Sequence, residues 1–450
     1  MVRILHFSDF HIKKDSMAEF ENAAKNMAES IKDKSIDFIV FSGDLVFKDY
    51  GFNTFKKVYD LLFKPILKTC GLSEDKLLIV PGNHDMDRDA ELQVITDGLS
   101  RISYIDNLEK FCNSSEQVKL SMGRFKNFNK FIHDKFAKNA NVTKFYISFT
   151  RELNGLKYGF VGLNSSWRCF ESAHDRGNLL FPVSQVRDAF SKVEGCDVVF
   201  CAMHHNISDF KDFIAQEMED IIHDKAHVLF TGHYHKMGVQ AVSTSDIGLI
   251  HSIAPATYNK NDKTSQYGYC LLNIDEETLE LQETPYYLVN GEFVEGKTRC
   301  LEIPMSEDKK KINDFRKLIR RKTQEAVLKA DDLFVYGKGT DDFQTFSNLF
   351  KEPIIKDKSL QEIITSHHDG KRVNLDSILQ SNKSIIIFGH DKCGKTSLLY
   401  KLLIESLKSY STSNVIPLYM DFKKLNKGKK AWNINDLLRQ YYELSRRHAE

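Results

Sequence analysis

Five short polar clusters in the first half of the chain constrain its fold more than any other feature. Each cluster follows a run of apolar residues, as the second follows Phe38-Ile39-Val40-Phe41. An apolar run that ends in polar residues is typical of a buried strand leading into a loop. Five such loops at one sheet edge would gather enough oxygen and nitrogen ligands for two metal ions. The clusters are Asp9-Phe10-His11, Gly43-Asp44, Gly82-Asn83-His84-Asp85, His204-His205 and Gly232-His233-Tyr234-His235.

Strand-like runs alternate with amphipathic helices around these clusters. Alternation of this kind predicts an α/β layer architecture, in which loops at the carboxyl ends of strands hold the ligands. We expect helices over residues 20–32 and 55–67, and strands over 36–42, 77–80, 157–163, 196–203, 226–231 and 268–274.

The order of the clusters resembles the signature of the calcineurin-like metallophosphoesterases over about residues 1–290. That signature runs Asp-x-His, Gly-Asp, Gly-Asn-His-Asp or Glu, His, and Gly-His-x-His. The resemblance implies a two-sheet sandwich flanked by helices, with two metal ions at its edge. It implies that Asp44 bridges the two ions. The other implied ligands are Asp9, His11 and His235 for one ion and Asn83, His204 and His233 for the other.

Three positions depart from the family pattern or leave a choice. His204 is preferred to His205 because relatives with a His-His pair usually ligate through the first histidine. Asn206 follows the pair where many relatives have proline. Phe47 stands where many relatives have a second aspartate, and Asp49 is a weak substitute for it.

The ligand types fit the hydrolysis of phosphate esters. A phosphate ester is anionic and repels hydroxide, and two metal ions roughly 3.5–4 Å apart lower the pKa of a bridging water and clamp the substrate for in-line attack. Imidazole and carboxylate ligands without thiolate favour manganese, iron or zinc. We expect His84 to serve the leaving oxygen, with Asp85 fixing its tautomer through a hydrogen bond. The alternative for His84 is a structural loop histidine.

Composition indicates a cytoplasmic protein without a membrane partner. The formal net charge is +1, so nucleic acid would have to bind through local patches. The eight cysteines include no Cys-x-x-Cys pair, which favours reduced thiols over a disulfide framework. No signal peptide is recognisable, and no apolar run approaches the ~20 residues that span a bilayer.

A long insertion over about residues 86–150 contains an aromatic helix. Its lysines lie opposite an apolar face, which favours a cap helix that buries its aromatic rings on the core. The alternative is a basic, aromatic lid over a nucleic-acid backbone. The apolar face consists of Phe125, Phe128, Ile132 and Phe136. Arg88, just past the third cluster, is a candidate phosphate contact, whereas Arg168 and Arg176 are expected to be salt-bridge partners in loops.

A second signal lies near the end of the chain. The strand-like run over residues 383–388 leads into Gly389-x4-Gly394-Lys395-Thr396, which is a P-loop pattern. Its backbone amides would cradle the phosphates of ATP or GTP, while Lys395 reaches the β- and γ-phosphates and Thr396 binds magnesium.

Residues of about 330–450 resemble the start of a NACHT-type NTPase of the STAND class. By that resemblance Asp421 precedes the Walker B strand rather than ending it, so we expect a truncated domain with weak nucleotide binding and no turnover. The predicted organisation is a phosphoesterase domain over 1–300, a charged linker helix over 301–335, and part of an NTPase domain over 336–450.

The combination resembles an anti-phage defence protein in which a STAND switch, through self-association, releases a phosphoesterase effector. A nuclease is the first hypothesis for the effector. The second is a phosphodiesterase for cyclic or linear nucleotides, because the His-His pair and the Asn-Ser-Ser run at Asn164 resemble such enzymes. A protein or small-molecule phosphatase is the third. The hypothesis of another class is an NTPase-gated signalling module whose metal site is structural or inactive in this chain.

Overall fold

The computed structural model describes two compact units, Met1–Lys310 and Lys311–Glu450, and each is described by itself below. The described residues of the first unit are 1–49, 51–90, 93–154, 156–169, 172–243, 247–255, 268–275, 278–305 and 307–310. Those of the second are 311–332, 346, 350–358, 362, 365, 370–381, 385–388, 393–409, 417–420, 439, 441 and 442. Within these residues, no helix is both long and apolar enough to cross a lipid bilayer.

One sheet of the first unit begins with the N-terminal strand. Its order is β13-β12-β11-β1-β2-β3, and β14 also pairs with β12. Strands β1, β2 and β3 run parallel, while β11 to β14 pair in antiparallel fashion. The strands are β1 (Val2–Phe7), β2 (Phe38–Phe41), β3 (Leu77–Ile79), β11 (Gly268–Ile274), β12 (Glu280–Val289), β13 (Glu292–Glu295) and β14 (Arg299–Glu302).

The second sheet has the order β4-β5-β6-β7-β8-β10-β9. Strands β6, β7, β8 and β10 are parallel, so their carboxyl ends share one edge. The strands are β4 (Asn141–Val142), β5 (Tyr146–Leu153), β6 (Leu156–Leu163), β7 (Val198–Ala202), β8 (Val228–Thr231), β9 (Gly238–Ser243) and β10 (Gly248–Ile253).

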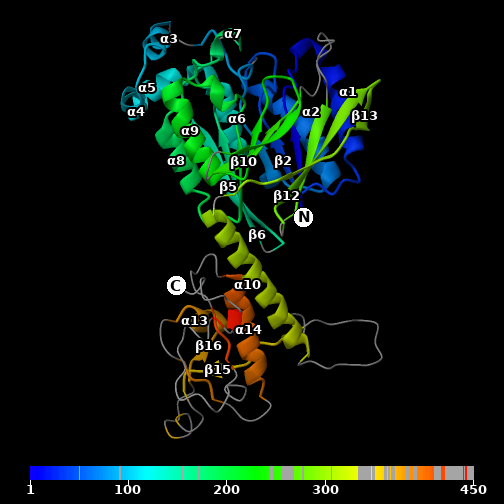
Figure 1. Cartoon of the computed structure of the whole chain (residues 1–450), viewed down its shortest axis with the longest axis vertical. Helices are drawn as coiled ribbons and strands as arrows, with labels where there is room; N and C mark the ends of the chain where they lie inside the picture. The colour runs from blue at the N-terminus through cyan, green and yellow to red at the C-terminus, as the bar shows by residue number, and fades with distance from the viewer. Residues whose placement is uncertain are drawn as a thin grey trace. The chain divides into compact units, whose positions relative to one another are not determined.

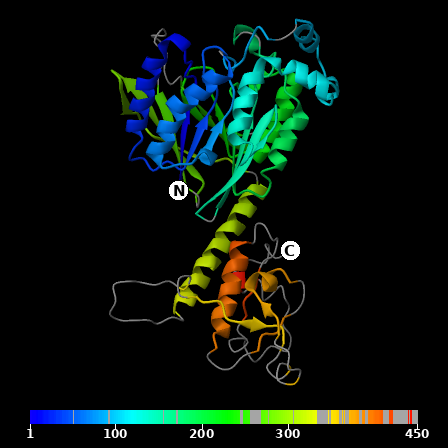
Figure 2. The same cartoon turned by 180° about the vertical axis from the view of Figure 1, so that it is seen from behind.

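The two sheets pack face to face, which confirms the expected sandwich (Figures 1 and 2). Aromatic rings fill the space between them: Phe38 of the first sheet lies 4.8 Å from Phe160 of the second, centroid to centroid. His6 of β1 also crosses this interface, because its Nδ1 lies 3.0 Å from the Ser252 hydroxyl of β10. This shared core fixes the strand ends of one sheet relative to those of the other.

Helices cover the outer faces of both sheets (Figure 1). On the first sheet, Phe63 of α2 contacts the rings of Phe7 and Phe41. The flanking helices are α1 (Met17–Ser30) and α2 (Phe52–Cys70) on one side and α8 (Val183–Ser191) and α9 (Asp212–Lys225) on the other. Short helical turns in the connections are η1 (Lys14–Ser16), η2 (Glu74–Lys76), α7 (Ser172–Asp175) and η4 (Ile207–Asp209).

The insertion forms a group of short helices, and its aromatic face is buried. Phe128 and Phe131 of α6 pack on Phe55 of α2, with ring centroids 5.6 and 5.9 Å apart. This confirms the cap-helix interpretation and removes these rings as stacking surfaces for nucleic acid. The elements are α3 (Gln93–Ser100), α4 (Ile105–Cys112), α5 (Ser115–Ser121), η3 (Gly123–Phe125) and α6 (Lys126–Phe136).

The second unit has a smaller core built between two helices. Ile319, Ala326 and Ala330 of α10 contribute to it, together with Leu403, Ile404 and Leu407 of α14. Its described elements are α10 (Glu307–Asp332), β15 (Ile355–Lys356), β16 (Arg372–Val373), α13 (Leu375–Leu379) and α14 (Lys395–Lys408). The long α10 lies where the sequence predicts a charged helix.

The strand expected before the P-loop is not formed in the described residues 385–388. Ile386 and Phe388 are 76% and 85% exposed, although a buried strand would place them in a core. A strand needs a hydrogen-bonded neighbour, and the strands described in this unit, β15 and β16, pair with each other. The expectation of a strand at this place was therefore wrong.

Candidate metal centre

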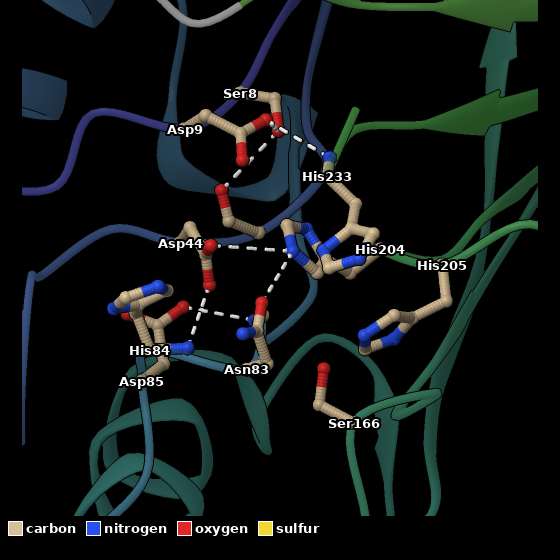
Figure 3. A network of polar contacts seen from close by, with 12 residues as sticks. Ser8, Asp9, Asp44, Asn83, His84, Asp85, Ser166, His204, His205 and His233 are labelled. Carbon is tan, nitrogen blue, oxygen red and sulfur yellow. Dashed lines mark hydrogen bonds and ion pairs between the residues drawn. The ribbon is translucent and has the colours of Figure 1, made fainter. Parts of the chain in front are cut away.

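All five polar clusters lie at the carboxyl ends of parallel strands. Asp9 and His11 follow β1, Asp44 follows β2, and the third cluster follows β3. The fourth and fifth clusters follow β7 and β8 of the other sheet. Because the sheets face each other, loops from both meet at one edge of the sandwich (Figure 3).

The backbone is held in a left-handed conformation at five of the predicted ligands. Their φ values lie between 48° and 70°, a region that residues other than glycine rarely adopt. Such a conformation costs about 1–3 kcal/mol per residue and persists where the surroundings enforce it. Here the β1 and β2 loops are tied together, since the Asp9 and His11 amides donate to the Gly43 and Asp44 carbonyls. The five residues are Asp9, His11, Asp44, His233 and His235.

Asp9, His11 and His235 form the first ligand group. Their ligand atoms all lie within 4.8 Å of one another. The Nε2 atoms of His11 and His235 face each other at 3.1 Å. Asp9 Oδ1 lies 3.3 Å from His235 Nε2, while Oδ2 accepts hydrogen bonds from the Ser8 hydroxyl and the His233 amide. The two hydrogen bonds to Oδ2 therefore hold the Asp9 carboxylate with Oδ1 toward the imidazoles of His11 and His235.

Asp44, Asn83 and His204 meet in the second group. His204 Nε2 lies 3.3 Å from Asp44 Oδ2 and 3.1 Å from Asn83 Oδ1, and Figure 3 shows both side chains turned toward this ring. His204 Nδ1 donates to the Ser42 carbonyl at 2.8 Å, which directs Nε2 to the centre. The His233 ring stands beside that of His204, with centroids 5.1 Å apart.

Asp44 lies between the two groups. Its Oδ2 is 3.3 Å from His204 Nε2 and 3.8 Å from His11 Nε2. A β-carbon at Gly82 would overlap the Asp44 carboxylate, so only glycine fits there. The structure thus brings together all seven residues that the sequence predicts as ligands, with Asp44 in the shared position.

The electrostatics of the centre favour a cation. Burial opposes a charged His204, but Asp44 and Asp9 outweigh it and raise the pKa of His204 to about 10. Burial lowers the pKa of His11 and of His233 to about 4, so both rings are neutral and offer a lone pair. Asp9 Oδ1 is buried and also faces the centre. The neutral imidazoles of His11 and His233, beside two buried carboxylates, are donors that fit divalent metal ions.

His84 lies in the centre, but Asp85 does not orient it as expected. The Asp85 carboxylate accepts backbone hydrogen bonds from Leu45, Val46 and Gly82. His84 Nδ1 instead lies 2.8 Å from the carbonyl oxygen of Phe47. A buried carboxylate surrounded by three amides is satisfied by the backbone, so Asp85 holds the β2 and β3 loops together. Burial, reinforced by Asp44, raises the pKa of Asp85 to about 7.

Ser165 supports the histidine pair, a role that was not predicted from the sequence. Its hydroxyl oxygen accepts from the amides of His204 and His205 and lies 3.2 Å from His205 Nδ1. With both lone pairs occupied, the hydroxyl donates to Nδ1, and the proton of a neutral His205 is then on Nε2. Ser165 lies 39 residues before His204, so no local pattern marks it.

Other predicted residues lie outside the ligand groups. Arg88 is exposed on the loop after the third cluster. Asp49 accepts hydrogen bonds from the Gly51 amide and the Asn127 side chain, so it does not replace the second aspartate of many relatives. Arg168 is buried beside Trp167.

The P-loop residues belong to the second unit. Gly394 has a φ of 84° and precedes the first residue of α14, Lys395. Thr396 is exposed in the first turn of that helix. Gly389 lies outside the described residues, as does Asp421.

Comparison with known families agrees with this geometry. The sequence profile described as Calcineurin-like phosphoesterase matches residues 2–237, which is more than half of the chain. The chain belongs to the calcineurin-like phosphoesterase family. Metallophosphoesterases of this family are metal-dependent phosphoester hydrolases, and the matched region contains both ligand groups.

Similar proteins include a curated relative and several solved structures. The chain is 22% identical over 402 residues to the "Uncharacterized metallophosphoesterase-like protein YydB" of Bacillus subtilis (strain 168), covering 80% of this chain and 77% of the relative. A purple acid phosphatase from yellow lupin is 10% identical with a TM-score of 0.41 and covers 68% of this chain, which spans 54% of the lupin enzyme. A dimetal phosphatase from Danio rerio is 9% identical with a TM-score of 0.37, covering 67% and 99% of the two chains.

Proposed function

We propose that the first unit is a dinuclear-metal phosphodiesterase that cleaves nucleic acid. The observation that carries the proposal is the position of Asp44, whose Oδ2 lies 3.8 Å from His11 Nε2 and 3.3 Å from His204 Nε2, between two clusters of metal-ligating side chains. Asp9, His11 and His235 would hold one ion, and Asn83, His204 and His233 the other. The donor set fits manganese, iron or zinc.

Two bound ions supply positive charge at the phosphate oxygens and lower the pKa of water at the site. The side chains then have separate tasks. Asp44 is held in place by the His84 amide, which donates to its Oδ1 at 2.8 Å. With its Nδ1 bonded to the Phe47 carbonyl, His84 keeps Nε2 to exchange a proton with the leaving oxygen.

The test is hydrolysis of bis-p-nitrophenyl phosphate, p-nitrophenyl phosphate and DNA by the full chain with manganese. We expect the diester and DNA to be cleaved in preference to the monoester. Asp44→Asn should abolish this activity, whereas Asp49→Asn should retain it because Asp49 bonds only Gly51 and Asn127 among the contacts described. Preference for the monoester would indicate a phosphatase, and equal activity of both variants would contradict the proposed site.

A phosphodiesterase for cyclic or linear nucleotides is a second candidate. The contact between Ser165 and His205 supports this candidate. Ser165 belongs to the Asn-Ser-Ser run and His205 to the His-His pair, and both runs resemble those of such enzymes. Hydrolysis of cyclic nucleotides at a higher kcat/KM than of oligonucleotides would favour this candidate.

For the second unit we propose the start of a STAND-type NTPase that controls the phosphoesterase by self-association in the cytoplasm. Gly394, Lys395 and Thr396 at the start of α14 support a phosphate site for ATP or GTP with magnesium. The signalling-module hypothesis predicts phosphoesterase activity only after nucleotide-driven oligomerisation, which light scattering and turnover measured together would test.

A further inference from the structure

Two aromatic side chains beside the metal centre are exposed. Phe47 and Tyr234 have 44% and 40% of their surface accessible, whereas most aromatic residues of this unit are buried. The Phe47 ring lies 5.4 Å from that of His84, and the Tyr234 ring lies 5.2 Å from that of His233. Each exposed ring therefore adjoins a histidine of the centre, and the two histidines belong to different sheets.

Phe47 is fixed by its backbone. Its amide donates to the Ile12 carbonyl at 3.0 Å, and its own carbonyl is bonded to His84 Nδ1 at 2.8 Å. These two bonds hold the Phe47 backbone beside His84, the residue proposed to serve the leaving oxygen.

A cation accompanies this ring. Lys13 Nζ lies 4.7 Å from the Phe47 ring centroid. Lys13 lies two residues after the first cluster. Its ammonium group is of the kind that binds a phosphate as a point charge. A flat apolar ring next to an ammonium group matches a nucleotide, which joins a flat base to an anionic phosphate.

Tyr234 is fixed through its hydroxyl group. That hydroxyl donates to the carboxylate of Asp209, which also accepts from the Asn206 amide at 2.9 Å. Because the Tyr234 hydroxyl is bonded in this way, the surface available beside His233 is the face of the Tyr234 ring.

We propose that Phe47 and Tyr234 are stacking surfaces for the bases next to the scissile phosphate, and that Lys13 binds the neighbouring phosphate. This inference rests on the proposed phosphodiesterase function and names its substrate class as single-stranded nucleic acid. Bases in a duplex are stacked on one another, whereas unpaired bases are free to stack on protein rings. Stacking tolerates any base, so little sequence preference is expected.

The experiment compares two single-stranded oligonucleotides of equal length, one normal and one in which abasic residues replace every nucleotide. Both carry the same phosphates, so the ratio of their kcat/KM values measures the contribution of the bases. In Phe47→Leu we expect this ratio to fall about tenfold, the scale of one lost base stack. Phe47→Trp should keep the ratio, and Tyr104→Leu, a change at a 71% exposed tyrosine of the insertion, should leave it unaltered.

The possible results distinguish failure of this inference from failure of the proposed phosphodiesterase function. An unchanged ratio in Phe47→Leu, or an equal fall in Phe47→Leu and Phe47→Trp, would overturn the role of the ring. Hydrolysis of bis-p-nitrophenyl phosphate by the unaltered chain without cleavage of either oligonucleotide would overturn the inference but keep a phosphodiesterase. Failure with all three substrates would reject the proposed function itself.

Discussion

At the scale of single residues, Ser165 supports the histidine pair beside the proposed second metal position. It bonds the amides of both His204 and His205, and removal of its hydroxyl leaves two buried amides without their acceptor. We expect Ser165→Ala to weaken binding of the second manganese ion about 10–100-fold, the usual cost of losing an outer partner of a ligand. Isothermal titration calorimetry of the metal-free chain would measure this change.

Ser166 provides the matched control for that experiment. It is equally buried, but its hydroxyl donates to the Pro81 carbonyl and contacts neither histidine amide. Ser166→Ala should therefore bind manganese as the unaltered chain does. Similar losses in both variants would mean that the loop as a whole, and not the Ser165 hydroxyl, positions His204.

Substitution of His84 would distinguish a catalytic role of this residue from a role in metal binding. Its ligand atom lies within 4.8 Å of those of His11 and Asp44, so geometry alone would also allow it to bind a metal ion. We expect His84→Asn to lower kcat for a diester about 10²–10⁴-fold, as for loss of a general acid. Metal content measured by atomic absorption should stay at two ions per chain, while Asp44→Asn should lose metal. Loss of one ion from His84→Asn would make His84 a ligand instead.

The cluster of candidate ligands at one edge was predictable from the sequence, whereas the contacts of the residues around it were not. Asp9, Asp44 and His233 each follow an apolar strand run, and this local pattern survives folding because parallel strands end at one edge. Ser165 and the Phe47 carbonyl act through contacts between distant segments. The interpretation of Asp85 failed for the same reason, since adjacency to His84 in sequence did not bring their side chains together.

At the scale of elements, strand β12 contains a buried carboxyl group. Glu283 is fully buried within the sheet. Burial raises the pKa of Glu283 to about 7 from an ordinary 4.5, although the Cys270 thiol and Arg299 oppose this rise. The folded state therefore holds a proton that the unfolded chain releases at lower pH.

Stability should consequently fall as pH rises from about 4.5 to about 7 and level off above it. Over this pH range the free energy of unfolding should fall by about 3 kcal/mol. We expect Glu283→Gln to flatten this dependence and to raise the free energy of unfolding at pH 8, measured by urea titration. Glu280→Gln, at an exposed position of the same strand, should retain the slope. An unaltered slope in Glu283→Gln would assign the dependence to other groups.

Elements were predicted best where one face is plainly apolar. The strand expected over residues 268–274 is β11, and the helix expected over 55–67 extends to Phe52–Cys70 in α2. The described residues 385–388 are just as apolar but form no strand, because apolarity does not provide a hydrogen-bonded neighbour. Pairing is a property of the sheet and cannot be read from one segment.

At the scale of the whole molecule, the chain joins two units with separate cores. The alignment with YydB covers 402 residues and is longer than the first unit, so it includes part of the second. The domain limits expected near residues 300 and 335 fall on either side of α10, and they stay a prediction.

Separate cores should give separate thermal transitions. Metal binds only the folded form of the first unit, and at a hundred times its dissociation constant it should stabilise that unit by about 2.7 kcal/mol per site. In differential scanning calorimetry, manganese should therefore raise one transition and EDTA should lower it. Magnesium ATP should raise the other transition if Lys395 and Thr396 bind phosphates, and Lys395→Ala should remove that shift. Asp44→Asn is the control for the metal effect. If manganese raises both transitions together, binding at the phosphoesterase centre is coupled to the second unit, and the linkage that an effector and its switch require is present in this chain.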